Sequence, residues 1–163
     1  MRARNLKLKT KNSGFTLIEL LVVISIIGIL SALILVNFNS ARARARDARR
    51  KGDLDQTKKA VLMYYNDHQS TYPTVAELDF GDAGLTSVDG NMTYMRLLPD
   101  DPNSPSETYT YVQVSLGQSF CLYASLENKA DSDIARSQMR CNEPCVVDGD
   151  VTFADSDYAV CPD

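Results

Sequence analysis

Four cysteines are the residues of this 163-residue chain whose type and spacing most plainly indicate chemistry. They lie in the last quarter of the sequence, at Cys121, Cys141, Cys145 and Cys161. Thiols in a small domain form disulfides or hold a structural zinc ion. One close Cys pair and a distant single histidine, His68, argue against zinc, so we expect disulfides in an oxidising compartment. Three pairings stay open, and our working pairing is Cys121 with Cys141 and Cys145 with Cys161.

Acidic side chains near the C-terminus are the candidates for cation binding. Calcium is held by clustered carboxylate and carbonyl oxygens, and the tail offers Asp148, Asp150, Asp155 and Asp157. The spacing does not complete a calcium-binding loop, so we favour a surface acidic loop. We expect no cofactor, and these four aspartates are the calcium candidates.

The sequence contains no catalytic constellation to accompany these residues. It has one histidine and no glycine-rich phosphate-binding loop, and the cysteines have a structural explanation. His68 is expected near a helix end, in a capping or surface role rather than in catalysis or metal binding. We therefore predict that the protein is not an enzyme.

Glu19 is the single charged residue of an apolar segment, residues 15–36. As a helix this segment spans roughly 33 Å at about 1.5 Å per residue, which matches a bilayer core of about 30 Å. A carboxylate placed centrally in such a helix costs about 2.5 to 3.5 kcal/mol on insertion scales. Glu19 therefore needs a partner or a position near the membrane interface.

The charges that flank the apolar segment predict its orientation. Residues 1–14 carry basic side chains and no acid, so the N-terminus is expected in the cytoplasm and the rest of the chain outside. The basic run 42–51 weakens this rule, but the cysteines favour the same direction. A cleavable secretory signal with its cut near 41–43 is the alternative; the unbroken apolar stretch 20–36 exceeds the usual signal core of about 7 to 15 residues.

The string Gly14-Phe15-Thr16-Leu17-Ile18-Glu19, after a basic leader and before the apolar run, resembles the processing signal of type IV prepilins and type II secretion pseudopilins. The resemblance covers about residues 14–73. It implies that a prepilin peptidase cuts between Gly14 and Phe15 and that Phe15 becomes an N-methylated terminus. Many members carry a proline near the end of the apolar run, whereas this chain has residues 36–39, Val-Asn-Phe-Asn, at that place.

The resemblance implies a structural subunit, a pilin, that first sits in the cytoplasmic membrane by one span with its head outside. It would then assemble as a homopolymer, an extracellular or periplasmic filament, with an assembly platform protein and its ATPase machinery. A type IV pilus, a type II secretion pseudopilus and a DNA-uptake pilus remain open. A membrane-tethered binding module is the alternative from another class, and the Gly14-Phe15 junction with Glu19 argues against it.

Cleavage gives Glu19 a partner, because it frees a cationic amine at Phe15, one helical turn away. In a filament the amine of a neighbouring subunit could take this role and set the axial register. Residues 41–51, ARARARDARRK, form a basic run that also needs a partner of opposite charge or exposure to solvent. The net charge is +9 for residues 1–51 and −13 for the remainder. We favour pairing of this run with acidic heads of adjacent subunits over a solvated face or attraction to DNA or anionic lipid, and the acidic head disfavours nucleic acid as a partner.

We predict an α+β fold, the type IV pilin-like fold, in which one long N-terminal helix packs on a small antiparallel β-sheet head. The helix has a transmembrane half, 15–36, and an amphipathic half, 37–69, and the head covers 70–163. A stripe of side chains at seven-residue spacing should carry the head: Leu54, Thr57, Val61, Tyr64 and His68.

Two further elements are expected in the head. Tyr72-Pro73 stops the helix, because the residue before proline disfavours the helical region, and a short helix is expected at 74–78. Residues 108–115 and 119–126 predict two strands of a β-hairpin, and residues 108–114, TYTYVQV, alternate as expected for a strand with one buried face. The polar tail from Glu127 cannot build much core and should depend on its disulfides.

Overall fold

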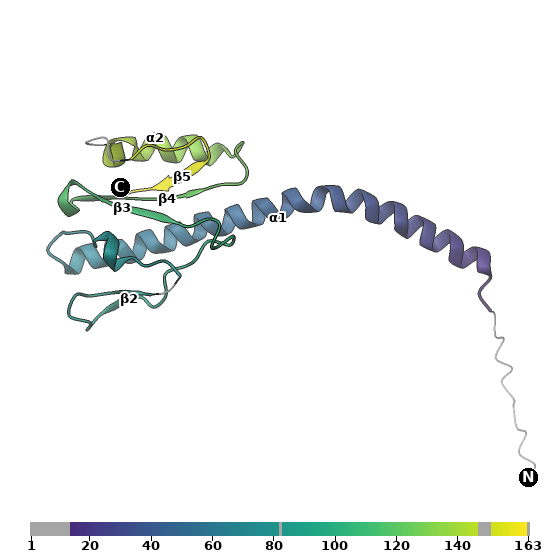
Figure 1. The fold of residues 1–163 in the computed structure, drawn as a ribbon, viewed down its shortest axis with the longest axis horizontal. Helices are drawn as coiled ribbons and strands as arrows, with labels where there is room; N and C mark the ends of the chain where they lie inside the picture. The colour runs from purple at the N-terminus through teal and green to yellow at the C-terminus, as the bar shows by residue number, and fades with distance from the viewer. Residues whose placement is uncertain (1–13, 82, 147–150, 163) are drawn as a thin grey trace, which may run out of the picture. The chain divides into compact units, whose positions relative to one another are not determined.

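One long helix, α1 at Leu17–Asp67, opens the computed structural model (Figure 1). The structure describes residues 14–81, 83–146 and 151–162, without the side chains of 33–37, 144 and 146. The chain divides within α1 into two units, Met1–Asn39 and Ser40–Asp163, which are taken one at a time below. The predicted leader, apart from Gly14, lies outside the described residues.

The N-terminal unit presents its apolar side chains to the surroundings, with Phe15 82% exposed. No helix in the described part of the chain is long and apolar enough to cross a membrane. The predicted span 15–36 includes residues 33–36, whose side chains lie outside the described part. The span therefore stays a prediction.

The second unit is built on the rest of α1, and the predicted stripe is its buried face. Leu54, Thr57, Val61 and Tyr64 are buried, and His68 is half-buried. The helix ends at Asp67, two residues before the predicted end at 69. The reason is that Gln69 and Ser70 adopt the left-handed conformation, with φ of 54° and 59°, which closes a helix.

The predicted hairpin is present as β3, Thr110–Val114, and β4, Ser119–Ser125. A third strand, β5 at Asp157–Val160, which was not predicted from the sequence, pairs with β4. The sheet order is β3-β4-β5 and both pairings are antiparallel. Together with α1 the sheet confirms the α+β class.

Strand β4 is buried on both faces. Phe120, Leu122 and Ala124 join the core that contains the buried face of α1. Cys121 and Tyr123 point to the other face, as alternation along a strand requires, and belong to a second core. Figure 1 shows the arrangement, with α1 on one side of the sheet and a second helix, α2 at Ser132–Val146, on the other.

The connection from α1 to β3 contains the predicted short helix, here a 3-10 turn at Val75–Glu77. It also forms a small hairpin, β1 at Leu85–Thr86 and β2 at Thr93–Met95, which makes a two-stranded sheet of its own. The Tyr94 hydroxyl donates to Asp67 Oδ2 at 3.1 Å and its ring meets Tyr64 edge to face. These contacts hold the small hairpin against α1.

Candidate functional site

The predicted processing site lies at the start of α1. Gly14 and Phe15 precede the helix and are exposed. The backbone N–H and hydroxyl of Thr16 donate to Glu19 Oε2 at 2.8 and 2.7 Å, and the Glu19 N–H donates to Thr16 Oγ1 at 3.3 Å. This reciprocal arrangement is a capping box. Glu19 thus already accepts hydrogen bonds from the residue next to the predicted new N-terminus.

The chain's second polar centre is buried and belongs to the head unit. Arg50 is 0% exposed. Its guanidinium donates to both carboxylate oxygens of Asp101, at 2.7 and 3.0 Å, to Asp47 Oδ1 at 2.8 Å and to Glu127 Oε1 at 3.0 Å. Hydrogen bonds to Asp101 first, and then to Asp47 and Glu127, raise the pKa of Arg50 above its ordinary value. We call these four residues the Arg50 network.

Asp47 links the Arg50 network to the backbone. Its two carboxylate oxygens accept the N–H groups of Glu127 and Asn128, both at 2.9 Å. Arg46 donates to both carboxylate oxygens of Glu127 at 2.6 Å, and one of these oxygens, Oε1, also accepts from Arg50. Arg46, followed by Arg50, lowers the pKa of Glu127 to about 2. The helix and the segment after β4 are thereby tied together by charge.

These contacts correct our interpretation of the basic run 41–51. We expected its charge to complement the heads of adjacent subunits, but three of its cations pair within the same head. Arg46 and Arg50 bind Glu127, and Lys51 Nζ lies 2.8 Å from Asp131 and 2.9 Å from Asp133. The physical reason is that the acidic segment after β4 folds back onto this part of α1. Much of the charge asymmetry is therefore satisfied inside one subunit.

All four cysteines form disulfides, as predicted, but the working pairing is wrong. The bonds join Cys121 to Cys145 and Cys141 to Cys161. Cys141 and Cys145 lie one turn apart on α2, so each reaches a different segment: Cys145 reaches β4, and Cys141 reaches the residue after β5. The Cα atoms are 5.6 Å apart in both pairs, within the usual range for a disulfide.

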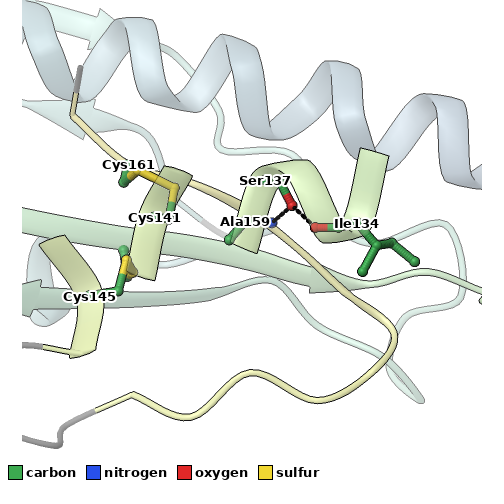
Figure 2. The surroundings of a disulfide bond; sticks show 7 residues. Ile134, Ser137, Cys141, Cys145, Ala159 and Cys161 are labelled. Atoms are coloured by element: carbon green, nitrogen blue, oxygen red, sulfur yellow. Dashed lines mark hydrogen bonds between the residues drawn. A yellow bond between two sulfur atoms is a disulfide. The ribbon is translucent and has the colours of Figure 1, made fainter. Parts of the chain in front are cut away.

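Ser137, one turn before Cys141, explains why the pairing takes this form (Figure 2). Its hydroxyl donates to Ile134 O at 2.8 Å and accepts the N–H of Ala159 at 3.1 Å. This fixes α2 beside β5, so the next turn brings Cys141 to Cys161 just past the strand. The following turn brings Cys145 to Cys121 on β4. We did not predict α2, because its polar sequence buries only a narrow stripe.

The calcium candidates divide between described and undescribed residues. Asp148 and Asp150 lie outside the described residues, and Asp155 is exposed. Asp157 is buried, and its Oδ2 accepts the N–H of Ala154 at 2.8 Å, which closes the turn before β5. Within the described residues, no group of three or more His, Cys, Asp or Glu side chains could hold a metal ion.

His68 lies in an aromatic group rather than among catalytic partners. Its ring stacks on Tyr64 with centroids 3.8 Å apart, and its Nδ1 lies 3.0 Å from the Tyr64 carbonyl oxygen. The Tyr64 hydroxyl donates to Glu77 at 3.0 Å. Burial, helped by Glu77, raises the pKa of Tyr64 to about 12. This agrees with the expected packing role of Tyr64 and the expected position of His68 near a helix end.

The fold and the N-terminal junction are those of a filament subunit with one long helix and a disulfide-bonded head. Residues 9–35 match the family described as the prokaryotic N-terminal methylation motif. The chain is 32% identical over 117 residues to the type IV major fimbrial protein FimA of Dichelobacter nodosus. These residues cover 68% of this chain and 73% of that protein. The chain belongs to the type IV pilin family and is a structural pilin subunit.

Two other proteins are also similar to the chain. The type IV wide pilus major component PilA4 of Thermus thermophilus is 42% identical over 81 residues, which are 50% of this chain and 60% of that protein. The type II secretion system core protein G of Aeromonas hydrophila is 28% identical over 145 residues, 81% of this chain and 96% of that protein. No solved structure matches the chain significantly.

Proposed function

We propose that the chain is inserted in the cytoplasmic membrane with its head outside, cut between Gly14 and Phe15, methylated at Phe15, and assembled into a type IV pilus. A prepilin peptidase, an assembly platform protein and its ATPase are the partners this route requires. The position of Glu19 carries the proposal. It is the single acid of the apolar segment, and it stands four residues from the amine that cleavage would free.

Charge balance gives Glu19 its function in the filament. In the precursor its carboxylate accepts hydrogen bonds from Thr16, three residues earlier. After cleavage, the Phe15 amine of the adjoining subunit supplies a full positive charge. Such a pair forms at one axial offset between subunits, because an unpaired charge in an apolar core costs several kcal/mol. Glu19 thus sets the register of the polymer.

Glu19→Ala tests this function. We expect the variant to insert in the membrane and to be cut at Phe15, but to yield few or disordered filaments in electron micrographs of sheared surface material. Mass spectrometry should find a methylated Phe15 in the wild type. Ser25→Ala is the matched control: its hydroxyl donates to Leu21 O of the same helix, at 2.7 Å, so filaments should form normally. Ordered filaments from Glu19→Ala would contradict the proposal.

A secretion pseudopilus is the second candidate function. The observation that favours it is the 96% coverage of the type II secretion system core protein G. Deletion of the gene separates the two functions. Loss of long surface filaments supports a pilus, whereas loss of exported enzymes from the medium, with no change in surface filaments, supports the pseudopilus.

A further inference from the structure

Residues 89–93, Asp-Gly-Asn-Met-Thr, form a pattern that the proposed function does not use. Within it, Asn91 is followed by a residue other than proline and then by Thr93. This is the acceptor pattern for N-glycosylation, which marks surface loops of exported proteins. Asp89 lies two residues before Asn91. Its carboxylate would add an ionic contact for a cationic side chain of a transferase.

The structure places the acceptor pattern at the tip of the small hairpin. Asn91 and Thr93 are both exposed. The Asn91 side-chain amide donates to Asp89 Oδ2 at 2.9 Å, and the Asn91 N–H donates to Asp89 Oδ1 at 3.3 Å. Gly90, with φ of 73°, has no neighbouring atom within 4 Å of where a Cβ would stand. The turn is therefore uncrowded at Gly90, the residue beside Asn91.

The small hairpin can also open at its tip while its base stays packed on the head. Its strands, β1 and β2, are two and three residues long and make no ladder with the three-stranded sheet. Hairpins of this size are marginally stable by themselves. Leu85, at the base, is fully buried and anchors the segment. Local opening of the tip thus presents Asn91 to an active site while the head stays folded.

The surface beside Asn91 has features that a bulky polar group would cover. Val88 and Met92 are 77% and 53% exposed, although both are large apolar side chains. They line a hollow of about 460 Å³ together with His68, Tyr94 and Asn91 itself. A sugar attached to Asn91 would lie over this hollow and remove the apolar side chains from water.

We propose that Asn91 carries an N-linked glycan in the mature subunit. The proposal rests on the proposed function, because the head meets a membrane-bound donor only outside the cytoplasm. The donor is an oligosaccharide on a polyprenyl diphosphate. Asn91 Nδ2 bonds to sugar C1 as the C1–O bond to the diphosphate breaks. The diphosphate leaves with the electron pair, and an amide proton passes to a base of the transferase.

Mass spectrometry of the subunit purified from its own cells tests the proposal. We expect a glycan mass on the peptide that contains Asn91. Asn91→Gln and Thr93→Ala should abolish it, whereas Thr93→Ser, which keeps the hydroxyl, should retain it. Asn142→Gln is the matched control, since Asn142 is exposed but lies outside the acceptor pattern, and it should change nothing. We expect Asp89→Asn to lower occupancy at least fivefold, and unchanged occupancy would overturn the role of Asp89.

The same spectra separate this proposal from the proposed function. A subunit that begins at methylated Phe15 and carries an unmodified Asn91 overturns the glycan and leaves the pilin function standing. A glycan that persists in Thr93→Ala also overturns the proposal, because the hydroxyl would then have no role. A subunit that retains Met1 contradicts the proposed processing instead.

Discussion

Arg50 and Asp101 form a two-bond ion pair in the interior of the head, with nitrogen–oxygen distances of 2.7 and 3.0 Å. The two residues are far apart in sequence, on α1 and in the loop before β3. Both side chains are almost completely removed from water. The pair therefore makes the position of the head on the helix depend on one buried cation.

Arg50→Met should strongly destabilise the head. It leaves the carboxylates of Asp47 and Asp101 buried without their cation, which costs about 3 to 5 kcal/mol. The free energy of unfolding can be measured by urea denaturation of the detergent-solubilised subunit, followed by near-UV circular dichroism of its tyrosines. Arg49→Met is the control. Its side chain is 62% exposed and 3.6 Å from Asp53, so a change of about 0.5 kcal/mol or less is expected. Equal losses in the two variants would show that the buried network has no special importance.

Glu127 should make the stability of the head depend on pH at the acid end. Arg46 and then Arg50 lower its pKa in the folded state from 4.5 to about 2. A carboxyl group whose pKa is lower in the folded state stabilises the fold at pH values above its unfolded-state pKa. This contribution to the free energy of unfolding disappears as the pH falls from about 4.5 to about 2. The difference in unfolding free energy between wild type and Glu127→Gln should therefore be present at pH 6 and vanish near pH 2. Glu107→Gln, at an exposed site, should show no such trend; a Glu127→Gln difference that is constant with pH would refute the assignment.

The disulfide pairing can be checked by removing cysteines two at a time. The double variant with Cys121→Ala and Cys145→Ala should contain no free thiol, because Cys141 and Cys161 still pair. The variant with Cys121→Ala and Cys141→Ala should contain two. Alkylation under denaturing conditions followed by mass spectrometry counts the thiols. The opposite counts would restore the pairing that we expected from the sequence.

Replacement of Gly117 and of Gly52 by alanine should change the stability of the head in opposite directions. Gly117 has φ of 87°, and an added Cβ would lie 2.7 Å from Thr71 Cγ2, so Gly117→Ala should destabilise the head by about 1 to 3 kcal/mol. Gly52 lies within α1 with no atom within 4 Å of an added Cβ, so Gly52→Ala should stabilise it by roughly 0.5 to 1 kcal/mol. Thermal unfolding of both variants compares the two, and destabilisation by both would show that the helix position is not open.

Local patterns in the sequence were sufficient to predict α1, its buried stripe and the β3–β4 hairpin. Leu54 and Val61 repeat at a helical period, and the alternation in residues 108–115 is that of a strand. The processing signal at Gly14 and Phe15 is equally local. Such features depend on neighbours in sequence, which is why they could be predicted.

The elements that sequence reasoning missed depend on contacts between distant segments. The stripe of α2 is interrupted by polar residues, and one of them, Ser137, is buried with its hydroxyl bonded to the distant Ala159 N–H. In the sequence, Arg50 looked like one member of a basic run that pairs with the acidic heads of adjacent subunits. The seven-residue stripe offered a usable signal, because Arg50 lies four residues before Leu54 and Asp47 lies seven before it, both on the buried face of the helix.

Because β4 is buried on both faces, formation of its disulfide depends on the alignment of the strand in the sheet. A slip of this strand by one residue would carry Cys121 away from Cys145 and put Phe120 against α2. The Cys121 thiol would then lie on the side occupied by α1, beyond reach of Cys145. Formation of the Cys121–Cys145 bond would therefore select chains in which β4 is correctly aligned.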